Sequence, residues 1–155
     1  MPAIATRPAT ASDLAELTAL FVDTFNAPPW NDGWTKDAAL ERLSTMVHVP
    51  HFRGAIAHDA TGAVGMLLGH VERWVAAYHF NLVEMCVTPE RQRTGIGTKL
   101  LEFMRDKLAQ EGIGKVYLMT APGTEAEAFY RKHGFERSKG RVVLVSSGPW
   151  TRSMT

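Results

Sequence analysis

Apolar residues recur at helical spacing in three long stretches of the chain. The first predicted helix begins after Thr10 or Ser12, either of which can cap it, and ends near Asn26 ahead of two prolines. Thr35 can cap the second predicted helix, and Gly112 ends the third. The stripe positions are Leu14, Leu17, Phe21 and Phe25 in the first helix, Leu40, Leu43 and Val47 in the second, and Ile96, Leu100, Phe103, Lys107 and Leu108 in the third.

Shorter apolar runs predict five strands, at residues 3–7, 53–59, 63–75, 80–87 and 115–120. A turn at residues 60–62 and a reversal at 76–79 make the middle three strands an antiparallel meander, with a bend at Gly65 or Gly69. A helix separates the last strand from the one before it, which favours parallel pairing of these two. The pattern predicts a mixed, largely antiparallel sheet.

The C-terminal part of the chain carries weaker signals. Thr124 can cap a short helix that ends at Gly134, and residues 135–137 and 141–146 suit a final hairpin. Residues 148–155 are polar apart from two side chains and are expected to fray. With no internal repeat or linker, residues 1–155 are expected to form a single domain of the α/β (α+β) class with about four helices.

Composition narrows the classes of partner and site. The formal net charge is +1, so the chain lacks the basic excess expected of a nucleic-acid-binding protein. A single cysteine, Cys86, excludes an internal disulfide framework and a Cys-rich zinc site, and no metal is expected. Neither a secretory signal nor a membrane-spanning apolar run is visible, so a cytoplasmic location without membrane contact is expected.

Glu84 is a carboxylate inside an otherwise apolar predicted strand. Simple alternation places it on one face with Phe80, Leu82 and Cys86. Burying a carboxylate is unfavourable unless it is paired, hydrogen-bonded or protonated. Glu84 could therefore reach solvent at the sheet edge, pair with Arg73 or another cation, or act as a base with a raised pKa. A bulge in the strand could change its direction.

The loop at residues 26–34 contains two tryptophans among Pro, Asn, Asp and Gly residues. These rings could cap the edge of the core, or line a pocket for an organic substrate with Asn31 and Asp32 as polar contacts. Both interpretations can hold together. The candidate substrate-binding residues are Asn26, Trp30, Asn31 and Trp34.

A glycine-containing turn, residues 92–97, precedes the third predicted helix. A helix start offers unpaired backbone N–H groups and the positive end of the dipole, which suit an anion such as a pyrophosphate. A P-loop does not fit the residues from Gly95 to Lys99, and a Rossmann fingerprint would need glycine in place of Leu100. The turn could also simply join strand to helix.

Two motifs together indicate a family. The segment at residues 87–101 resembles motif A of the GCN5-related N-acetyltransferases (GNAT), with Val87, Pro89, Gln92, Gly95 and Gly97 at the matching positions. Residues 126–135 resemble motif B, with its Phe-Tyr-x-Lys-x-Gly-Phe core. The two motifs cover residues 80–137, and a weaker resemblance extends to most of the chain. The resemblance implies the GNAT fold, in which the parallel strand pair splays apart.

The resemblance also implies acetyl-CoA as the donor. In the family, the backbone of the motif-A turn holds the pyrophosphate, and the preceding strand segment pairs with the pantetheine arm. The implied cofactor-binding residues are Met85, Cys86 and Val87 on the strand, and Gln92, Arg93, Thr94, Gly95, Ile96, Gly97 and Thr98 in the turn and helix start. The family often has an Asn where this chain has Gly123, and Thr120 or Thr124 could substitute for it.

The implied reaction is direct attack of a primary amine on the thioester. Tyr130 stands at the family's position for the acid that assists the departing thiolate. Glu84 is the first choice for the base, with Glu72, His79 or water in reserve. An acetylated Cys86 intermediate is disfavoured, because a lone cysteine on an apolar strand usually serves packing.

A small-molecule amine is the expected partner. The lead-in to the loop at residues 26–34 resembles some small-molecule acetyltransferases, including aminoglycoside-modifying relatives, and Asp23, Asp32, Asp37 and Glu72 could supply an acidic pocket. The alternatives are an acetyltransferase for a protein or peptide amine and a non-catalytic acyl-CoA-binding module. Family members are often dimers, which favours a homodimer.

Overall fold

The structure is a computed structural model that describes residues 3–150. The chain divides between Met119 and Thr120 into two compact units. The first contains β1 (Ala5–Pro8), α1 (Leu14–Phe25), α2 (Lys36–His48), β2 (Phe52–Asp59), β3 (Gly62–Arg73), β4 (Tyr78–Val87), α3 (Ile96–Gln110) and β5 (Lys115–Leu118), with 3-10 turns η1 (Ala11–Asp13) and η2 (Pro89–Arg91). The second contains α4 (Glu125–Lys132).

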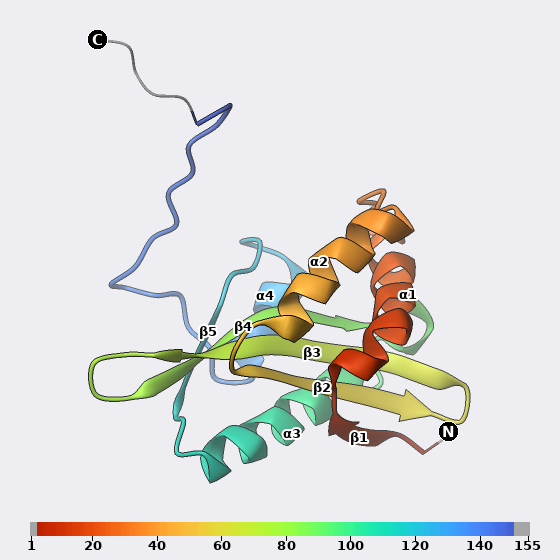
Figure 1. Cartoon of the computed structure of the whole chain (residues 1–155), viewed down its shortest axis with the longest axis horizontal. Coiled ribbons are helices and arrows are strands. Elements are labelled where there is room, and N and C mark those ends of the chain that lie inside the picture. The colour runs from red at the N-terminus through yellow and green to blue at the C-terminus, as the bar shows by residue number, and fades with distance from the viewer. Residues whose placement is uncertain (1–2, 151–155) are drawn as a thin grey trace. The chain divides into compact units, whose positions relative to one another are not determined.

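The five strands form one mixed sheet in the order β1-β2-β3-β4-β5. All neighbours are antiparallel except β4 and β5, which pair in parallel. This is the sheet that the sequence predicts. In the first unit α1 and α2 cover one face and α3 covers the other (Figure 1).

The core on the α1/α2 face explains why these helices carry apolar stripes. Phe21 of α1 and Leu43 of α2 are almost fully buried there against Met66 and Leu68 of β3. On the opposite face Ile96 and Leu100 of α3 lie directly under β3, where a Cβ on Gly65 would come within 3.0 Å of both. Burial of each large aliphatic side chain contributes about 1.5–3 kcal/mol, so packing on both faces fixes the sheet between its helices.

A β-bulge in β4 changes which face Glu84 occupies. Leu68 pairs with Glu84 and Gly69 pairs with Leu82, so Val83 is the extra residue. Directly opposed residues point to the same face, so Glu84 and Cys86 lie on the α1/α2 face. Phe80 and Leu82 point to the other face, which corrects the alternation expected from the sequence. Gly69 permits the bulge, because a Cβ there would stand 2.2 Å from the carbonyl oxygen of Asn81.

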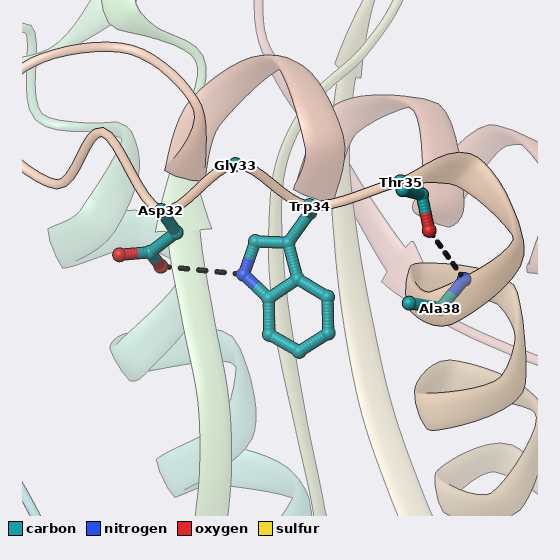
Figure 2. Close-up of a pocket in the computed structure, with 5 residues that line it drawn as sticks. All are labelled: Asp32, Gly33, Trp34, Thr35 and Ala38. Atoms are coloured by element: carbon teal, nitrogen blue, oxygen red, sulfur yellow. Dashed lines mark hydrogen bonds between the residues drawn. The ribbon is translucent and has the colours of Figure 1, made fainter.

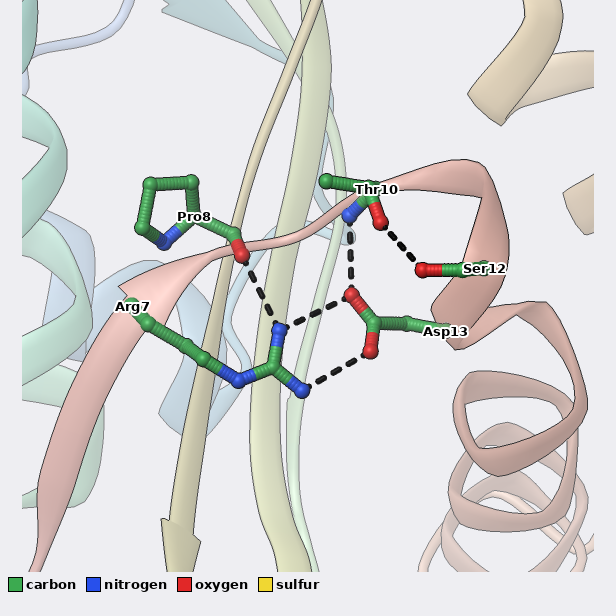
Figure 3. A network of polar contacts seen from close by, with 5 residues as sticks. All are labelled: Arg7, Pro8, Thr10, Ser12 and Asp13. Atoms are coloured by element: carbon green, nitrogen blue, oxygen red, sulfur yellow. Dashed lines mark hydrogen bonds and ion pairs between the residues drawn. The ribbon is translucent and has the colours of Figure 1, made fainter.

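Polar contacts fix the start of the first helical segment (Figure 3). Thr10 is the residue that caps η1, and its backbone N–H donates to the Asp13 carboxylate at 2.9 Å. The Arg7 guanidinium donates to both oxygens of the same carboxylate, at 2.9 and 2.8 Å. These contacts connect β1 to α1. The cap on α2 forms as expected, because the Thr35 hydroxyl accepts the N–H of Ala38.

The predicted C-terminal hairpin is wrong. Residues 135–150 contain no strand, and the side chains from Val142 to Val145 are 66–89% exposed. The first arm is held by α4 instead: Phe135 N–H donates to the Tyr130 carbonyl at 3.1 Å, and Arg137 binds Glu127. A two-stranded hairpin has little stability of its own, so these contacts prevail. Residues 148–150 contain no helix or strand, and the rest of the expected tail, 151–155, lies outside the described residues.

Candidate functional site

The turn between β4 and α3 has a backbone that only certain residues adopt comfortably. Arg93 and Gly95 both have positive φ angles, 63° and 87°. Gly95 caps α3 in the left-handed conformation, which explains the glycine at that position. The Gln92 side-chain amide donates to the Val87 carbonyl at 3.0 Å, and the Thr94 hydroxyl donates to the Arg91 carbonyl. The turn is thus held by its own side chains.

The start of α3 can receive an anion. The first N–H groups of an α-helix have no carbonyl partner within the helix and carry the positive end of its dipole. Gly95 accepts the first helical hydrogen bond, from Lys99 N–H at 3.1 Å, and the space where its Cβ would stand is empty to 4 Å. Ile96 and Cys86 have buried side chains, so these two expected cofactor-binding residues offer only backbone to a ligand. The turn therefore fits a pyrophosphate.

An ion pair that the sequence did not reveal anchors this turn. Arg91 in η2 binds Asp59 at the end of β2. The Asp59 side chain is 1% exposed, and its carboxylate also accepts the Thr61 hydroxyl and N–H. These Thr61 bonds first, and then Arg91, lower the pKa of Asp59. The turn between β2 and β3 thereby holds η2 in place.

The end of β4 leaves a backbone edge beside the glycine turn. Parallel pairing of β4 with β5 runs from His79–Lys115 to Leu82–Leu118 and ends there. Residues 83–87 continue β4 beyond the last pair, because β5 itself ends at Leu118. Met85 and Val87 are partly exposed and Cys86 is buried. Residues 85–87, which are expected to pair with the pantetheine arm, lie on this part of β4, and the splaying of the two strands stays a prediction.

Glu84 lies on the α1/α2 face and meets Arg42 of α2. The guanidinium donates to Glu84 Oε1 from Nε at 2.8 Å and from Nη2 at 2.5 Å. The Glu84 side chain is 12% exposed and that of Arg42 is 43% exposed. Burial raises the pKa of Glu84, Arg42 opposes this rise, and the charge of Asp32 adds to it. The structure therefore pairs this carboxylate with a cation, yet keeps its pKa above the ordinary value.

The loop between α1 and α2 forms an open pocket (Figure 2). It is lined by Asp32, Gly33, Trp34, Thr35 and Ala38 and has a volume of about 410 Å³. The Trp34 indole N–H donates to Asp32 at 3.2 Å, and the ring packs edge-on against Phe21 with centroids 4.9 Å apart. Trp34 therefore fits both interpretations of the loop tryptophans, since its ring covers the edge of the core and also lines a pocket.

The other expected substrate-binding residues shape this loop in different ways. Asn26 and Trp34 exchange two hydrogen bonds between the Asn26 amide group and the Trp34 backbone, at 2.9 and 2.6 Å. Asn26 thus closes the loop. Trp30 is 37% exposed and lies near Phe25, with ring centroids 5.8 Å apart, while Asn31 is exposed at a φ of 49°. Neither Trp30 nor Asn31 is among the residues that line the pocket.

The two reserve bases occupy other surroundings. Glu72 accepts the Tyr117 hydroxyl with both oxygens, at 2.7 and 2.6 Å, and His70 Nε2 lies 3.0 Å from its Oε1. Burial, and then the hydrogen bond to Glu72, raise the pKa of Tyr117 to about 12. His79 stacks on Trp74 at 4.9 Å. Glu72 is thus already fixed by two neighbours.

Cys86 has the properties of a packing residue. It belongs to the core on the α1/α2 face, and burial raises the pKa of its thiol to about 12. A thiol in that state is a poor nucleophile at neutral pH. The chemistry available to Cys86 therefore disfavours an acetylated cysteine.

Tyr130 lies on α4, in the second unit. Thr124 caps this helix by accepting the N–H of Glu127 at 3.2 Å, and its hydroxyl also donates to the Ala121 carbonyl. The Thr124 hydroxyl thus both accepts and donates a hydrogen bond at the start of α4. The Tyr130 ring packs edge-on against Phe129 and Phe135, with centroids 5.4 and 5.6 Å away.

Comparison with known families identifies the chain. The model of the family described as "Acetyltransferase (GNAT) domain" matches residues 50–137, more than half of the sequence. The chain belongs to the GNAT acetyltransferase family. The resemblance inferred from motifs A and B is thereby confirmed, and the mixed sheet with four helices is the GNAT fold. No curated protein matches the sequence significantly.

Solved structures of similar fold include several GNAT enzymes. The aminoglycoside N-acetyltransferase AAC(6')-Iy in complex with CoA has a TM-score of 0.74 at 18% identity, covering 95% of this chain and 96% of its own. An aminoglycoside acetyltransferase from an uncultured soil metagenomic sample, with sisomicin, has 0.73 at 17%, covering 94% and 96%. The ribosomal-protein-alanine N-acetyltransferase of Brucella melitensis biovar Abortus 2308 has 0.73 at 12%, covering 94% and 100%. At such identities the likeness shows the fold.

Sequence reasoning missed Arg42 as the partner of this GNAT protein's Glu84. The available signal was indirect: Arg42 precedes buried Leu43 on a helix whose other face is polar, so its side chain borders the core. A buried carboxylate on a strand needs a cation nearby, and this requirement could have pointed to α2.

In residues 3–150, no helix is both long and apolar enough to cross a membrane.

Proposed function

We propose that this GNAT protein transfers an acetyl group from acetyl-CoA to a primary amine of a small molecule. The observation that carries the proposal is the position of Glu84. It is a nearly buried carboxylate with a raised pKa, on the strand whose end leads into the anion-binding turn. A base of this kind beside a CoA-binding turn suits amine acetylation.

The donor would be held by the backbone. Residues 92–98 would bind the pyrophosphate, and residues 85–87 would pair with the pantetheine arm along the edge that β5 leaves open. Acetyl-CoA supplies the acetyl group as an activated thioester. Gly95 and Gly97 let the backbone approach the ligand closely.

The amine must lose a proton before it can attack. Glu84 would accept this proton, directly or through a water molecule, because its raised pKa brings it nearer to neutral pH than an ordinary carboxyl. Tyr130, at the family's position for the acid, would give its proton to the departing sulfur. The pocket at Asp32 and Trp34 would receive the acceptor, and the Asp32 carboxylate there would favour a cationic amine.

The similar structures support a small-molecule acceptor but do not identify which amine it is. Two are aminoglycoside acetyltransferases, one of them solved with sisomicin, while another is named for a ribosomal protein. A protein or peptide amine is therefore the second acceptor class to test. The homodimer and the cytoplasmic location stay predictions.

The test is turnover with defined acceptors. The protein is incubated with acetyl-CoA and a panel of aminoglycosides, polyamines, simple monoamines and peptide amines, and the free thiol of CoA is measured. Turnover with a small amine is expected. Glu84→Gln and Tyr130→Phe should each lower kcat by about 10²–10⁴-fold, while Glu41→Gln and Tyr78→Phe, at exposed positions, should not.

Two results would count against the proposal. Turnover confined to peptide amines would mean that the acceptor is a protein or peptide amine and not a small molecule. Tight CoA binding with no turnover of any acceptor, and no effect of either site variant on that binding, would instead indicate a non-catalytic acyl-CoA-binding module.

A further inference from the structure

The contact between Arg42 and Glu84 is asymmetric in two respects. Both guanidinium hydrogen bonds end on Oε1, so Oε2 receives neither of them. The carboxylate is nearly buried, whereas the arginine side chain is 43% exposed. An arginine in this arrangement fixes one oxygen of the carboxylate and leaves the other for a different partner.

Arg42 also contacts the loop that forms the pocket. Its guanidinium carbon lies 6.0 Å from the centroid of the Trp34 ring, the outer range of a cation–π contact. The Trp34 indole donates to Asp32, which lines the same pocket. Arg42 of α2 therefore contacts both Trp34, in the loop between α1 and α2, and Glu84 on β4.

We propose that Arg42 is a positioning residue for acetyl transfer: it holds Glu84 by Oε1, keeps the carboxylate ionised in its buried place and leaves Oε2 to take the proton of the acceptor amine. This inference rests on the proposed function, in which Glu84 is the base. It extends that function by assigning a role to a side chain that the family motifs do not include.

The charges around Glu84 give the role its physical basis. Burial raises the pKa of Glu84, and the negative charge of Asp32 raises it further. Cys86, on the same face of β4, is neutral because burial raises the pKa of its thiol to about 12. His70 lies on this face of β3 and is bound to Glu72. Arg42 is the positive group that counteracts burial, so its removal should leave Glu84 protonated up to a higher pH.

The experiment compares pH profiles of kcat/KM for wild type, Arg42→Gln and Arg42→Lys over roughly pH 5–9. The acid limb of Arg42→Gln should move to higher pH, and below that limb the rate should fall about tenfold for each unit of displacement. Above the limb the rate should recover. Arg42→Lys keeps the charge and should shift the limb less. Arg53→Gln, which breaks the Arg53–Glu111 pair, is the matched control and should leave the limb unchanged.

Several results would overturn the proposal. An acid limb that coincides with that of wild type would do so, as would a loss of activity that is equal at every pH, which a purely structural role predicts. Because an unpaired buried charge can destabilise the fold, thermal melts accompany each variant, and Arg42→Gln is also made in the Glu84→Gln background. That double variant should show no further shift of the limb.

A readout without turnover separates this inference from the proposed function. The carboxyl carbon of Glu84 is titrated by ¹³C NMR, with its resonance assigned by its loss in Glu84→Gln. A higher pKa of Glu84 in Arg42→Gln supports the coupling even if no acceptor is turned over, in which case only the proposed function fails. An unchanged pKa of Glu84 overturns the coupling even if the wild type is an active enzyme.

Discussion

Arg91 and Asp59 join the turn that follows β4 to the turn between β2 and β3, at the same end of the sheet. Arg91 precedes Gln92 directly, and Asp59 closes β2 where the chain turns into β3. The Asp59 carboxylate is held by Thr61 as well, so it is already oriented when it meets Arg91. The turn thus takes its place from a well-ordered hairpin rather than from its own residues alone.

Asp59→Asn should therefore weaken the binding of CoA, although residue 59 is not one of the residues proposed to contact CoA. Loss of the charged partner frees Arg91 and loosens η2, so the dissociation constant of CoA and the KM for acetyl-CoA should rise by roughly two- to tenfold. The KM for the amine should stay the same. Calorimetric titration with CoA measures the first effect and steady-state kinetics the others. Glu111→Gln breaks a comparable ion pair away from the turn and serves as the control; equal effects of the two variants would refute the anchoring role.

Gly95→Ala should impair the turn through its backbone. A left-handed residue with a Cβ is disfavoured by about 1–2 kcal/mol, and Gly95 has a φ of 87°. We expect a loss of stability of that size and weaker CoA binding, because the first turn of α3 must shift to relieve the strain. Gly114→Ala is the matched control, since a Cβ there meets open space and its φ is not left-handed. Unchanged CoA affinity in Gly95→Ala would contradict the proposed role of this helix start.

Periodicity predicted most of the fold because burial determines it. The stripes of α1, α2 and α3 bury most of their apolar side chains, although Leu40 of the predicted α2 stripe is exposed and Ala39 is buried instead. The meander follows from turn residues at known spacing. The bulge at Val83 was not predictable in position, since it depends on how β3 and β4 settle around Gly69. That bulge determines which face of the sheet Glu84 occupies, and therefore that Arg42 is its partner.

The errors have a physical cause in common. The final hairpin was predicted from local β propensity, yet contacts of Phe135 and Arg137 with α4 decide the path of that segment. Arg42 and Asp59 were missed because their partners are far away in sequence. Local pattern thus predicted most of the elements and the glycine-containing turn before α3, whereas the polar contacts between elements needed the structure.

Cys86→Ala should leave acetyl transfer largely intact. The thiol is buried in the core and its pKa is raised to about 12, so it supplies packing rather than a nucleophile. A loss of stability of about 1 kcal/mol is expected from the smaller side chain. Intact-protein mass spectrometry after mixing with acetyl-CoA should show no acetylated protein in wild type. An acetylated wild type together with an inactive Cys86→Ala would establish a covalent route instead.

Asp13→Asn should reveal a pH-dependent part of the stability. The hydrogen bonds from Arg7, and then the Thr10 N–H, lower the pKa of Asp13 (Figure 3). A carboxyl whose pKa is lower in the folded protein stabilises it above the pKa of the unfolded chain, about 3.9. That contribution disappears as pH falls through the folded-state pKa. Asparagine can still accept the Thr10 N–H, so the substitution removes mainly the charge that Arg7 binds.

The expected loss in the free energy of unfolding is about 0.5–1 kcal/mol at pH 7, because the Arg7 side chain is largely solvated and its contribution is screened. The difference between variant and wild type should begin to shrink as pH falls below about 3.9 and should vanish only below the folded-state pKa of Asp13, provided that both proteins remain folded there. Urea titrations at a series of pH values measure it. Asp106→Asn, at an exposed position of α3, controls for the change in net charge. A difference that stays constant from pH 7 to the acid range would contradict a contribution from the charge of Asp13.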